Sequence, residues 1–140
     1  MREIIFRGKT YEGEWVQGTY YHQTEFYGDK TDFHYIIESC DQLEDNMMIF
    51  FGVIPETVGQ YTGLTDKNGT KIFEGDIVRI GFGDKIWETA REVVFEEGQW
   101  FFKCNSNSMK SYIGAWGNSV VEVIGKIHDN PELLRGEDNV

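Results

Sequence analysis

The groups with the greatest chemical capacity in the first half of the chain are His22, His34, Glu38 and Cys40. Imidazole, carboxylate and thiolate are the ligands that zinc prefers in proteins. Their spacing matches no established ligand pattern, and no Cys-x-x-Cys pair accompanies them. We therefore expect surface histidines here, and the sequence assigns no metal site and no cofactor.

No other segment carries a recognisable catalytic pattern. His128 follows an apolar run and precedes an acidic turn, which is typical of a solvated or hydrogen-bonded side chain. Residues 66–70, DKNGT, lack the later acidic ligands of a calcium loop and instead predict a hairpin turn. Residues 81–83 are not followed by Gly-Lys-Ser/Thr, and neither Cys40 nor Cys104 lies in a nucleophile motif. We expect no catalytic residues and no enzymatic activity.

The charge of the chain opposes binding to duplex DNA. It has 13 Lys and Arg against 24 Asp and Glu, for a net charge of −11, whereas DNA affinity usually comes from clustered cations that neutralise phosphates. Single strands, which bind partly by stacking on aromatic rings, are the more favourable nucleic acid. The candidate residues for such a face are the basic Lys85, Arg91, Lys103 and Lys110 and the aromatic Trp87, Trp100 and Phe102.

Three features predict a cytoplasmic protein that does not enter a membrane. Cys40 and Cys104 are far apart, as expected for two reduced thiols. The first nine residues, MREIIFRGK, interrupt their apolar positions with charges, unlike a signal peptide. The longest apolar run, residues 47–51, is far too short to cross a bilayer.

Composition and periodicity predict a mainly β fold. The chain has 140 residues, of which 40% are hydrophobic, with 4 Trp, 7 Tyr, 10 Phe and 16 Gly. This composition suits many short strands around a core that needs no disulfide. Polar residues 22–32 predict an exposed loop, acidic residues 40–46 predict no helix, and Asn130 is a candidate N-cap for a helical turn over residues 130–135. The expected strands are residues 4–6, 14–21, 33–37, 49–54, 71–73, 76–82, 86–95, 99–104, 111–115 and 120–128, with hairpin turns at residues 10–13 and 96–98.

Two glycines in residues 58–80 predict specific backbone geometry. Asn68-Gly69 is typical of a tight turn, in which Gly69 takes a positive φ. Gly75-Asp76 precedes a β-branched run, and such a step permits a sharp strand entry with Asp accepting backbone hydrogen bonds. Together these features predict an antiparallel β unit.

The domain hypothesis places a boundary near Pro55. We expect an N-terminal antiparallel β lobe over residues 1–57, an SH3-like β-barrel over residues 58–130, and a short helical turn with a frayed tail over residues 131–140.

Four segments resemble, in order, the YopX proteins of bacteriophages and prophages. They are MREIIFRGK, residues 14–18, VGQYTGLTDKNGTKIFEGDIV and GKIHDNPELL. The resemblance covers nearly the whole chain and is weakest over residues 22–50. It implies a mostly β fold with an SH3-like barrel, a phage or prophage origin and a bacterial cytoplasm. The family is of unknown function, so the resemblance supplies no catalytic residues.

Three classes of function remain, in decreasing order of preference. The first is a non-enzymatic accessory or adaptor protein that binds an unknown phage or host protein through aromatic side chains, with Tyr20, Tyr21, Phe26 and Tyr27 as candidates. Core packing is the alternative role of these four. The second class is a nucleic-acid-associated protein and the third an enzyme. Homo-oligomerisation is also expected, against the alternative of a monomer kept apart by its charge.

Overall fold

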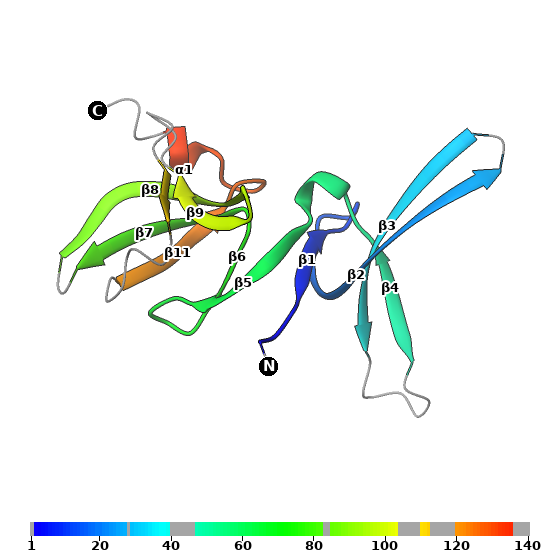
Figure 1. The fold of residues 1–140 in the computed structure, drawn as a ribbon, viewed down its shortest axis with the longest axis horizontal. Helices are drawn as coiled ribbons and strands as arrows, with labels where there is room; N and C mark the ends of the chain where they lie inside the picture. The colour runs from blue at the N-terminus through cyan, green and yellow to red at the C-terminus, as the bar shows by residue number, and fades with distance from the viewer. Residues whose placement is uncertain are drawn as a thin grey trace. The chain divides into compact units, whose positions relative to one another are not determined.

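The computed structural model describes residues 2–27, 29–39, 47–82, 85–103, 110–112 and 120–135. The protein is mainly β, as predicted, with two antiparallel sheets (Figure 1). Its helical segments in the described residues are η1 (Pro55–Thr57) and α1 (Glu132–Arg135). The chain divides into two compact units, Met1–Tyr61 and Thr62–Val140.

One antiparallel sheet has six strands in the order β4-β3-β2-β1-β5-β6, and the first unit contains β1 to β4 and the start of β5. A hairpin joins β1 to β2 through the expected turn, where the Thr10 N–H donates to the Glu14 carbonyl over 2.8 Å. The N-terminal strand begins later than predicted, because it is Phe6 and not Ile4 that pairs with β2. Its strands are β1 (Phe6–Lys9), β2 (Trp15–Tyr27), β3 (Asp29–Ser39), β4 (Met48–Gly52) and the first residues of β5 (Gly59–Thr65).

The prediction of an exposed loop over residues 22–32 is wrong. This segment forms the far half of the β2–β3 hairpin, which pairs without interruption from Thr19↔Ile37 to Tyr27↔Asp29 (Figure 1). Its polar residues lack the hydrophobic alternation that marks a half-buried strand. Backbone pairing, together with cross-strand contacts such as Thr24 with Asp32, holds the ribbon instead.

The core of the first unit lies on one face of this sheet. Val16, Ile36 and Val53 are buried there, and the partly buried Phe6, Tyr20, Phe51 and Val58 pack against them. Because successive side chains of a strand alternate between faces, Ile36 fixes the even-numbered residues of β3 toward the core.

The second unit is an antiparallel sheet with the order β10-β9-β8-β7-β11. The five strands of this sheet, and also β6, confirm the sequence prediction within two residues at each described end. Strand β5, which was not predicted, is the neighbour of β6 in the six-stranded sheet. Its first residues belong to the first unit and its last residues to the second. The strands of this sheet are β7 (Asp76–Phe82), β8 (Lys85–Glu96), β9 (Gln99–Lys103), β10 (Lys110–Tyr112) and β11 (Val120–Lys126), and β6 (Lys71–Phe73) belongs to the six-stranded sheet. Residues 104 and 113–115, also expected in strands, and the 40–46 segment lie outside the described residues.

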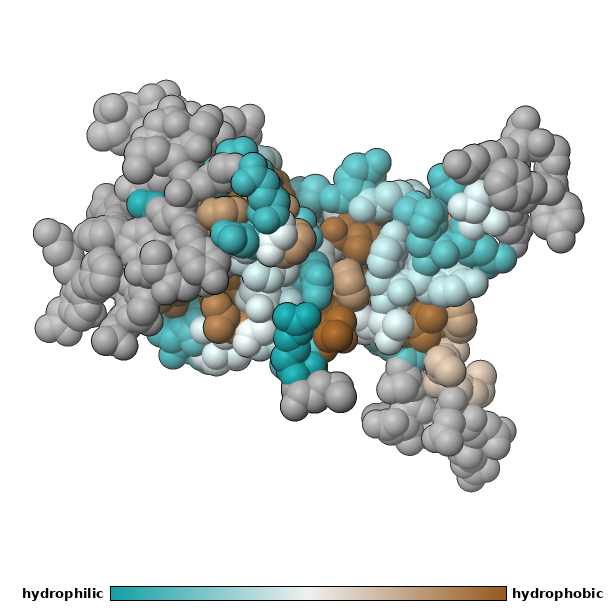
Figure 2. Space-filling model, in the orientation of Figure 1, coloured by the Kyte–Doolittle hydropathy of each residue, from teal (hydrophilic) through white to brown (hydrophobic). Residues whose placement is uncertain are grey.

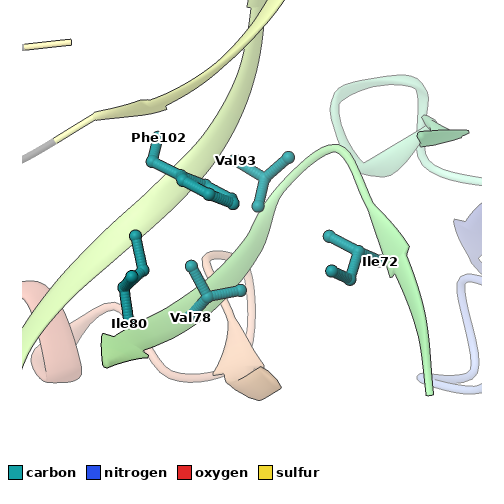
Figure 3. Close-up of a cluster of buried hydrophobic side chains, with 5 residues drawn as sticks. All are labelled: Ile72, Val78, Ile80, Val93 and Phe102. Atoms are coloured by element: carbon teal, nitrogen blue, oxygen red, sulfur yellow. The ribbon is translucent and has the colours of Figure 1, made fainter. Parts of the chain in front are cut away.

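Side chains are buried on both faces of the second sheet. One cluster joins Ile72, Val78, Ile80, Val93 and Phe102, from β6, β7, β8 and β9 (Figure 3). The opposite cluster joins Ile77 and Ala90 to Leu134 of α1. The helix begins near the predicted position, but the Asn130 side chain accepts a hydrogen bond from the Lys126 N–H over 3.3 Å, so it ties the preceding turn together.

In the part of the chain that the structure describes, the five strands of the second sheet form an open sheet and not a closed barrel. No pairing there joins β10 to β11. Within the same residues, no helix has the length and apolar character needed to span a membrane.

Candidate functional site

A group of four aromatic side chains, two of them exposed and two half-buried, lies on the β2–β3–β4 part of the first sheet, on the face away from the core. We call Tyr21, Phe33, Tyr35 and Phe50 the aromatic face. Tyr35 lies at its centre, with its ring 6.5 Å from Tyr21, 6.2 Å from Phe33 and 5.9 Å from Phe50. Tyr21 is 44% exposed and Phe50 is 55% exposed. Hydrophobic surface is visible in Figure 2 near the β4 end of this unit.

Strand register explains why these rings gather. Tyr21 lies directly opposite Tyr35, and Phe50 lies opposite Ile37, two residues along β3 from Tyr35. Ile36, between them, points to the core and is fully buried. Residues 33, 35 and 37 therefore point outward. A row of large apolar rings on a solvated face is unusual for a sheet that already buries its other face.

The core-facing side of the same ribbon carries a polar row. The Tyr20 hydroxyl and His34 Nδ1 are 2.5 Å apart, and the His34 ring stacks on His22 with centroids 4.3 Å apart. His22 Nε2 lies 3.5 Å from Asp32 Oδ1, which also accepts a hydrogen bond from the Thr24 hydroxyl. Burial raises the pKa of the Tyr20 hydroxyl.

This row does not form a metal centre among the described residues, where no group of three metal-ligating side chains was found. His22 and His34 stack face to face, and their described contacts go to Asp32 and Tyr20. Glu38 accepts a hydrogen bond from the Gln17 N–H over 3.3 Å. Cys40 lies outside the described residues. The row is thus suited to holding the ribbon in register.

The four candidate aromatics do not form one surface. Tyr20 packs against the core and contacts Phe6, with ring centroids 5.5 Å apart. Tyr21, its neighbour in the chain, lies on the aromatic face. The side chains of Phe26 and Tyr27 lie outside the described set. Core packing therefore accounts for Tyr20 and surface exposure for Tyr21.

Three members of the aromatic face were not predicted as surface residues. Phe33, Tyr35 and Phe50 were expected in strands but not assigned to a surface. Their signal was the two-residue alternation around Ile36, combined with the exposed positions of β4. Only the pairing register of β3 with β4 and β2 shows which side of the alternation is exposed.

The basic residues that are candidates for a nucleic-acid-binding face lie in the second unit, and acidic neighbours partly neutralise the charge of Lys103. Lys103 lies opposite Glu92 on β8, and its Nζ is 3.9 Å from a Glu96 carboxylate oxygen. Arg91 is half-buried. The side chains of Lys85 and Lys110 lie outside the described set.

The aromatic rings that are candidates for stacking on nucleic-acid bases differ in their burial. Phe102 is 1% exposed and belongs to the core, so its assignment to a stacking surface is wrong. Trp100 packs on Phe95, with centroids 4.8 Å apart, and also against the core. Phe95 itself is 48% exposed. The Trp87 side chain lies outside the described set.

Residues 66–70 form the predicted turn. Asp66 is buried, and its Oδ1 accepts hydrogen bonds of 2.9 Å from the N–H groups of Asn68 and Thr70. Its Oδ2 accepts a third from Val123 of β11 over 3.0 Å. Burial by itself raises the pKa of this carboxyl, but the three backbone donors outweigh burial and lower it. The carboxylate is occupied in holding the backbone, which is a structural role.

Asp76 has a comparable role at the entry to β7. It is fully buried, and its Oδ2 accepts a hydrogen bond of 2.7 Å from the Phe73 N–H. Gly75 before it has a φ of 88°, as the strand-entry prediction requires. Its N–H donates to Val93, and its carbonyl accepts from Ile127. Through these hydrogen bonds the Gly-Asp step connects β6, β8 and the turn that follows β11. His128, after this region, is exposed.

The described residues thus form a mainly β protein of two compact units, with an aromatic surface on the first. The chain belongs to the YopX family, because the family model described as YopX protein matches residues 5–135. The comparison with curated proteins found no match.

Two solved structures share the fold. Protein EF1440 from Enterococcus faecalis has a TM-score of 0.55 and 23% identity, over 96% of this chain and 99% of that chain. Protein yopX from Bacillus subtilis has a TM-score of 0.54 and 16% identity, over 93% of this chain and 97% of that chain. At these identities the likeness establishes the fold alone.

Proposed function

We propose that this chain is a non-enzymatic phage or prophage accessory protein that binds a phage or host protein in the bacterial cytoplasm. The observation that supports the proposal is the aromatic face, on which Tyr35 contacts Tyr21, Phe33 and Phe50. Aromatic side chains are enriched at protein interfaces, since they bury much apolar area and lose little conformational entropy. In this proposal the second unit is a variant of the SH3-like barrel.

Charge and ring chemistry define the partner that suits this surface. Phe33 and Phe50 offer apolar area, whereas Tyr21 and Tyr35 add hydroxyl groups that can hydrogen-bond at the edge of a contact. A net charge of −11 attracts basic proteins and repels acidic ones. We therefore expect a partner that presents an apolar patch surrounded by Lys or Arg.

The test is a comparison of single-site variants as bait in extracts of phage-infected host cells. Tyr21→Ser removes an exposed ring from the aromatic face. Tyr11→Ser removes an equally large ring, 71% exposed, from the β1–β2 turn of the same unit. We expect Tyr21→Ser to lose a partner that the wild type and Tyr11→Ser both retain. Equal retention by all three baits would contradict the proposal, because capture would then not depend on this face.

A single-stranded nucleic acid is the second candidate ligand. The observation in its favour is the partly exposed Phe95 beside Trp100 on the β8–β9 hairpin. Stacking on such rings tolerates any base. Glu96 and Glu97 follow Phe95 directly, and their charges oppose a polyanion, so this candidate ranks second.

A further inference from the structure

Strand β4 is an edge strand whose outer side carries no partner strand among the described residues. Its five residues, MIFFG, contain no charge and no proline, and Met47 before them is apolar as well. Natural sheets usually protect such edges with charged residues, proline or a covering segment. The edge strand β11 shows that protection, since its Val121 carbonyl accepts a hydrogen bond from Lys67 and its Val123 N–H donates to Asp66.

The pairing with β3 determines which backbone groups of β4 face outward. The Val53 N–H donates to the His34 carbonyl over 3.0 Å, and Val53 continues the β4 register. Hydrogen-bonded and non-hydrogen-bonded pairs alternate along an antiparallel ladder. Ile49 and Phe51 therefore direct their N–H and C=O groups toward β3. Met48 and Phe50 direct theirs to the open side.

The open part of the edge ends before Val53. Thr10 forms an antiparallel bridge with Val53, and the Ile54 N–H donates to the Lys9 carbonyl over 2.9 Å. The end of β1 therefore covers the continuation of β4. An incoming strand must pair with the Met48–Phe50 part of the edge.

We propose that β4 pairs with β4 of a second copy of this chain, antiparallel and about a two-fold axis at Ile49. In this register Met48 lies opposite Phe50 of the second copy, and the reverse pair is equivalent. Met48 and Phe50 are the residues whose backbone groups point outward, so each pair forms both of its hydrogen bonds. The sequence thus supplies its own complementary strand, and a two-fold contact of this kind closes without further growth.

The side chains on both faces suit this register. Met48 is 64% exposed and Phe50 is 55% exposed. In the dimer Met48 of each copy would lie beside Phe50 of the other copy, where contact between sulfur and an aromatic ring is favourable. Ile49 would meet Ile49 on the opposite face. The contact contains no charged residue, which matters because two copies with a net charge of −11 repel each other everywhere else.

The size of the contact indicates a weak dimer. Met47, Met48, Ile49 and Phe50, each exposing roughly half of about 200 Å², offer about 400 Å² per copy. Stable interfaces bury about 800 Å² per partner. We therefore expect dimerisation that depends on protein concentration and strengthens when salt screens the repulsion between copies.

The experiment is sedimentation velocity of the full chain over a wide concentration range, at low and at raised salt. The wild type is expected to move from the monomer mass of 16.2 kDa toward twice that mass. Ile49→Lys is expected to weaken dimerisation by at least about tenfold, because it places two like charges on the axis. In the monomer the new lysine lies opposite Glu38, a favourable cross-strand pair, so the fold is retained.

Phe50 belongs both to this contact and to the aromatic face, so a control variant and a second measurement are needed to distinguish the two surfaces. Tyr21→Ser changes that face but leaves the edge intact, and it should dimerise like the wild type. Amide hydrogen exchange should show protection rising with concentration at Met48 and Phe50, while Ile49 and Phe51 stay unchanged. A mass of 16.2 kDa at every concentration and salt would overturn the proposal. So would a dimer that Tyr21→Ser abolishes and Ile49→Lys does not.

Discussion

The backbone N–H of Val123 donates to Oδ2 of Asp66 over 3.0 Å, across 57 positions of sequence. The same carboxylate holds the Asn68 and Thr70 N–H groups of its own turn. One buried side chain therefore closes the turn before β6 and attaches it to β11. Removing the charge should loosen both connections together.

Asp66→Asn is expected to reduce the free energy of unfolding by about 1–3 kcal/mol at neutral pH, because an amide replaces one acceptor oxygen with a donor that faces backbone N–H groups. The pKa of Asp66 is lowered in the folded protein, so its stabilisation is present above the unfolded value near 3.8. It is lost as the pH falls through the lower folded value. Denaturant unfolding at several pH values should therefore show a wild-type advantage that shrinks toward acid. An advantage independent of pH would contradict this account.

Gly69→Val and Gly75→Val should each destabilise the protein by roughly 1–3 kcal/mol. The φ angles are 82° at Gly69 and 88° at Gly75, where a β-branched residue is strained. At Gly75 an added Cβ would also lie 3.5 Å from Ile127 Cγ2, whereas at Gly69 it meets nothing within 4 Å. Strain of the backbone is thus the common cause. Chemical denaturation with wild-type midpoints for both variants would show that these angles relax without cost.

Glu92→Gln should raise the unfolding midpoint at neutral pH. Burial is the largest cause of the raised pKa of Glu92, and Glu74 and Glu96 add to it while Lys103 acts against it. A folded pKa above the unfolded value means that stability is lost as the pH rises through the folded value. The gain from Glu92→Gln should therefore disappear near pH 4, below the ordinary carboxyl value of 4.5. Glu97→Gln, an equal change of charge at an exposed turn position, is the control.

Tyr20→Phe should cost about 0.5–1.5 kcal/mol, the usual value of one hydrogen bond. The change removes the hydroxyl that contacts His34 Nδ1 and keeps the ring that packs on Phe6. A double-mutant cycle with His34→Ala tests the coupling, because Tyr20→Phe should cost much less once His34 is absent. Equal costs in both backgrounds would assign the effect to packing.

Local patterns predicted the strands of the second unit because β6, β7 and β8 bury β-branched residues and β9 buries Phe102. Ile77 and Val78 pack into different clusters on opposite faces of β7, and that buried run is visible in the sequence. The outer half of the β2–β3 hairpin was not predictable in this way, since backbone pairing holds it and its described side chains are polar. The contact of Asp66 with Val123 depends on how β11 returns to the turn, which no local pattern encodes.

The aromatic face could not be predicted from local sequence patterns either. Tyr20 and Tyr21 are adjacent and chemically identical, yet one packs against the core and the other is exposed. Only the position of Ile36 opposite Tyr20 decides between them. A one-residue shift in pairing would exchange their environments.

The last prediction concerns nucleic acid. Each phosphate contact requires a free cation, but Lys103 lies near Glu92 and Glu96, and Lys67 Nζ lies 3.4 Å from Glu122. Counterion release by such neutralised cations is small. We expect no duplex DNA binding tighter than about 10 μM near physiological salt, orders of magnitude weaker than specific complexes.

Fluorescence anisotropy with labelled duplex and single-stranded oligonucleotides tests this prediction. Phe95→Ser is the informative variant, since that ring is the exposed member of the Phe95–Trp100 pair. If single strands bind by stacking, this change should weaken them by about 1–3 kcal/mol and leave the salt dependence unchanged. Submicromolar, salt-sensitive binding of duplex DNA would instead show that the cations act together despite their acidic neighbours, and would place the nucleic-acid function above the protein-binding one.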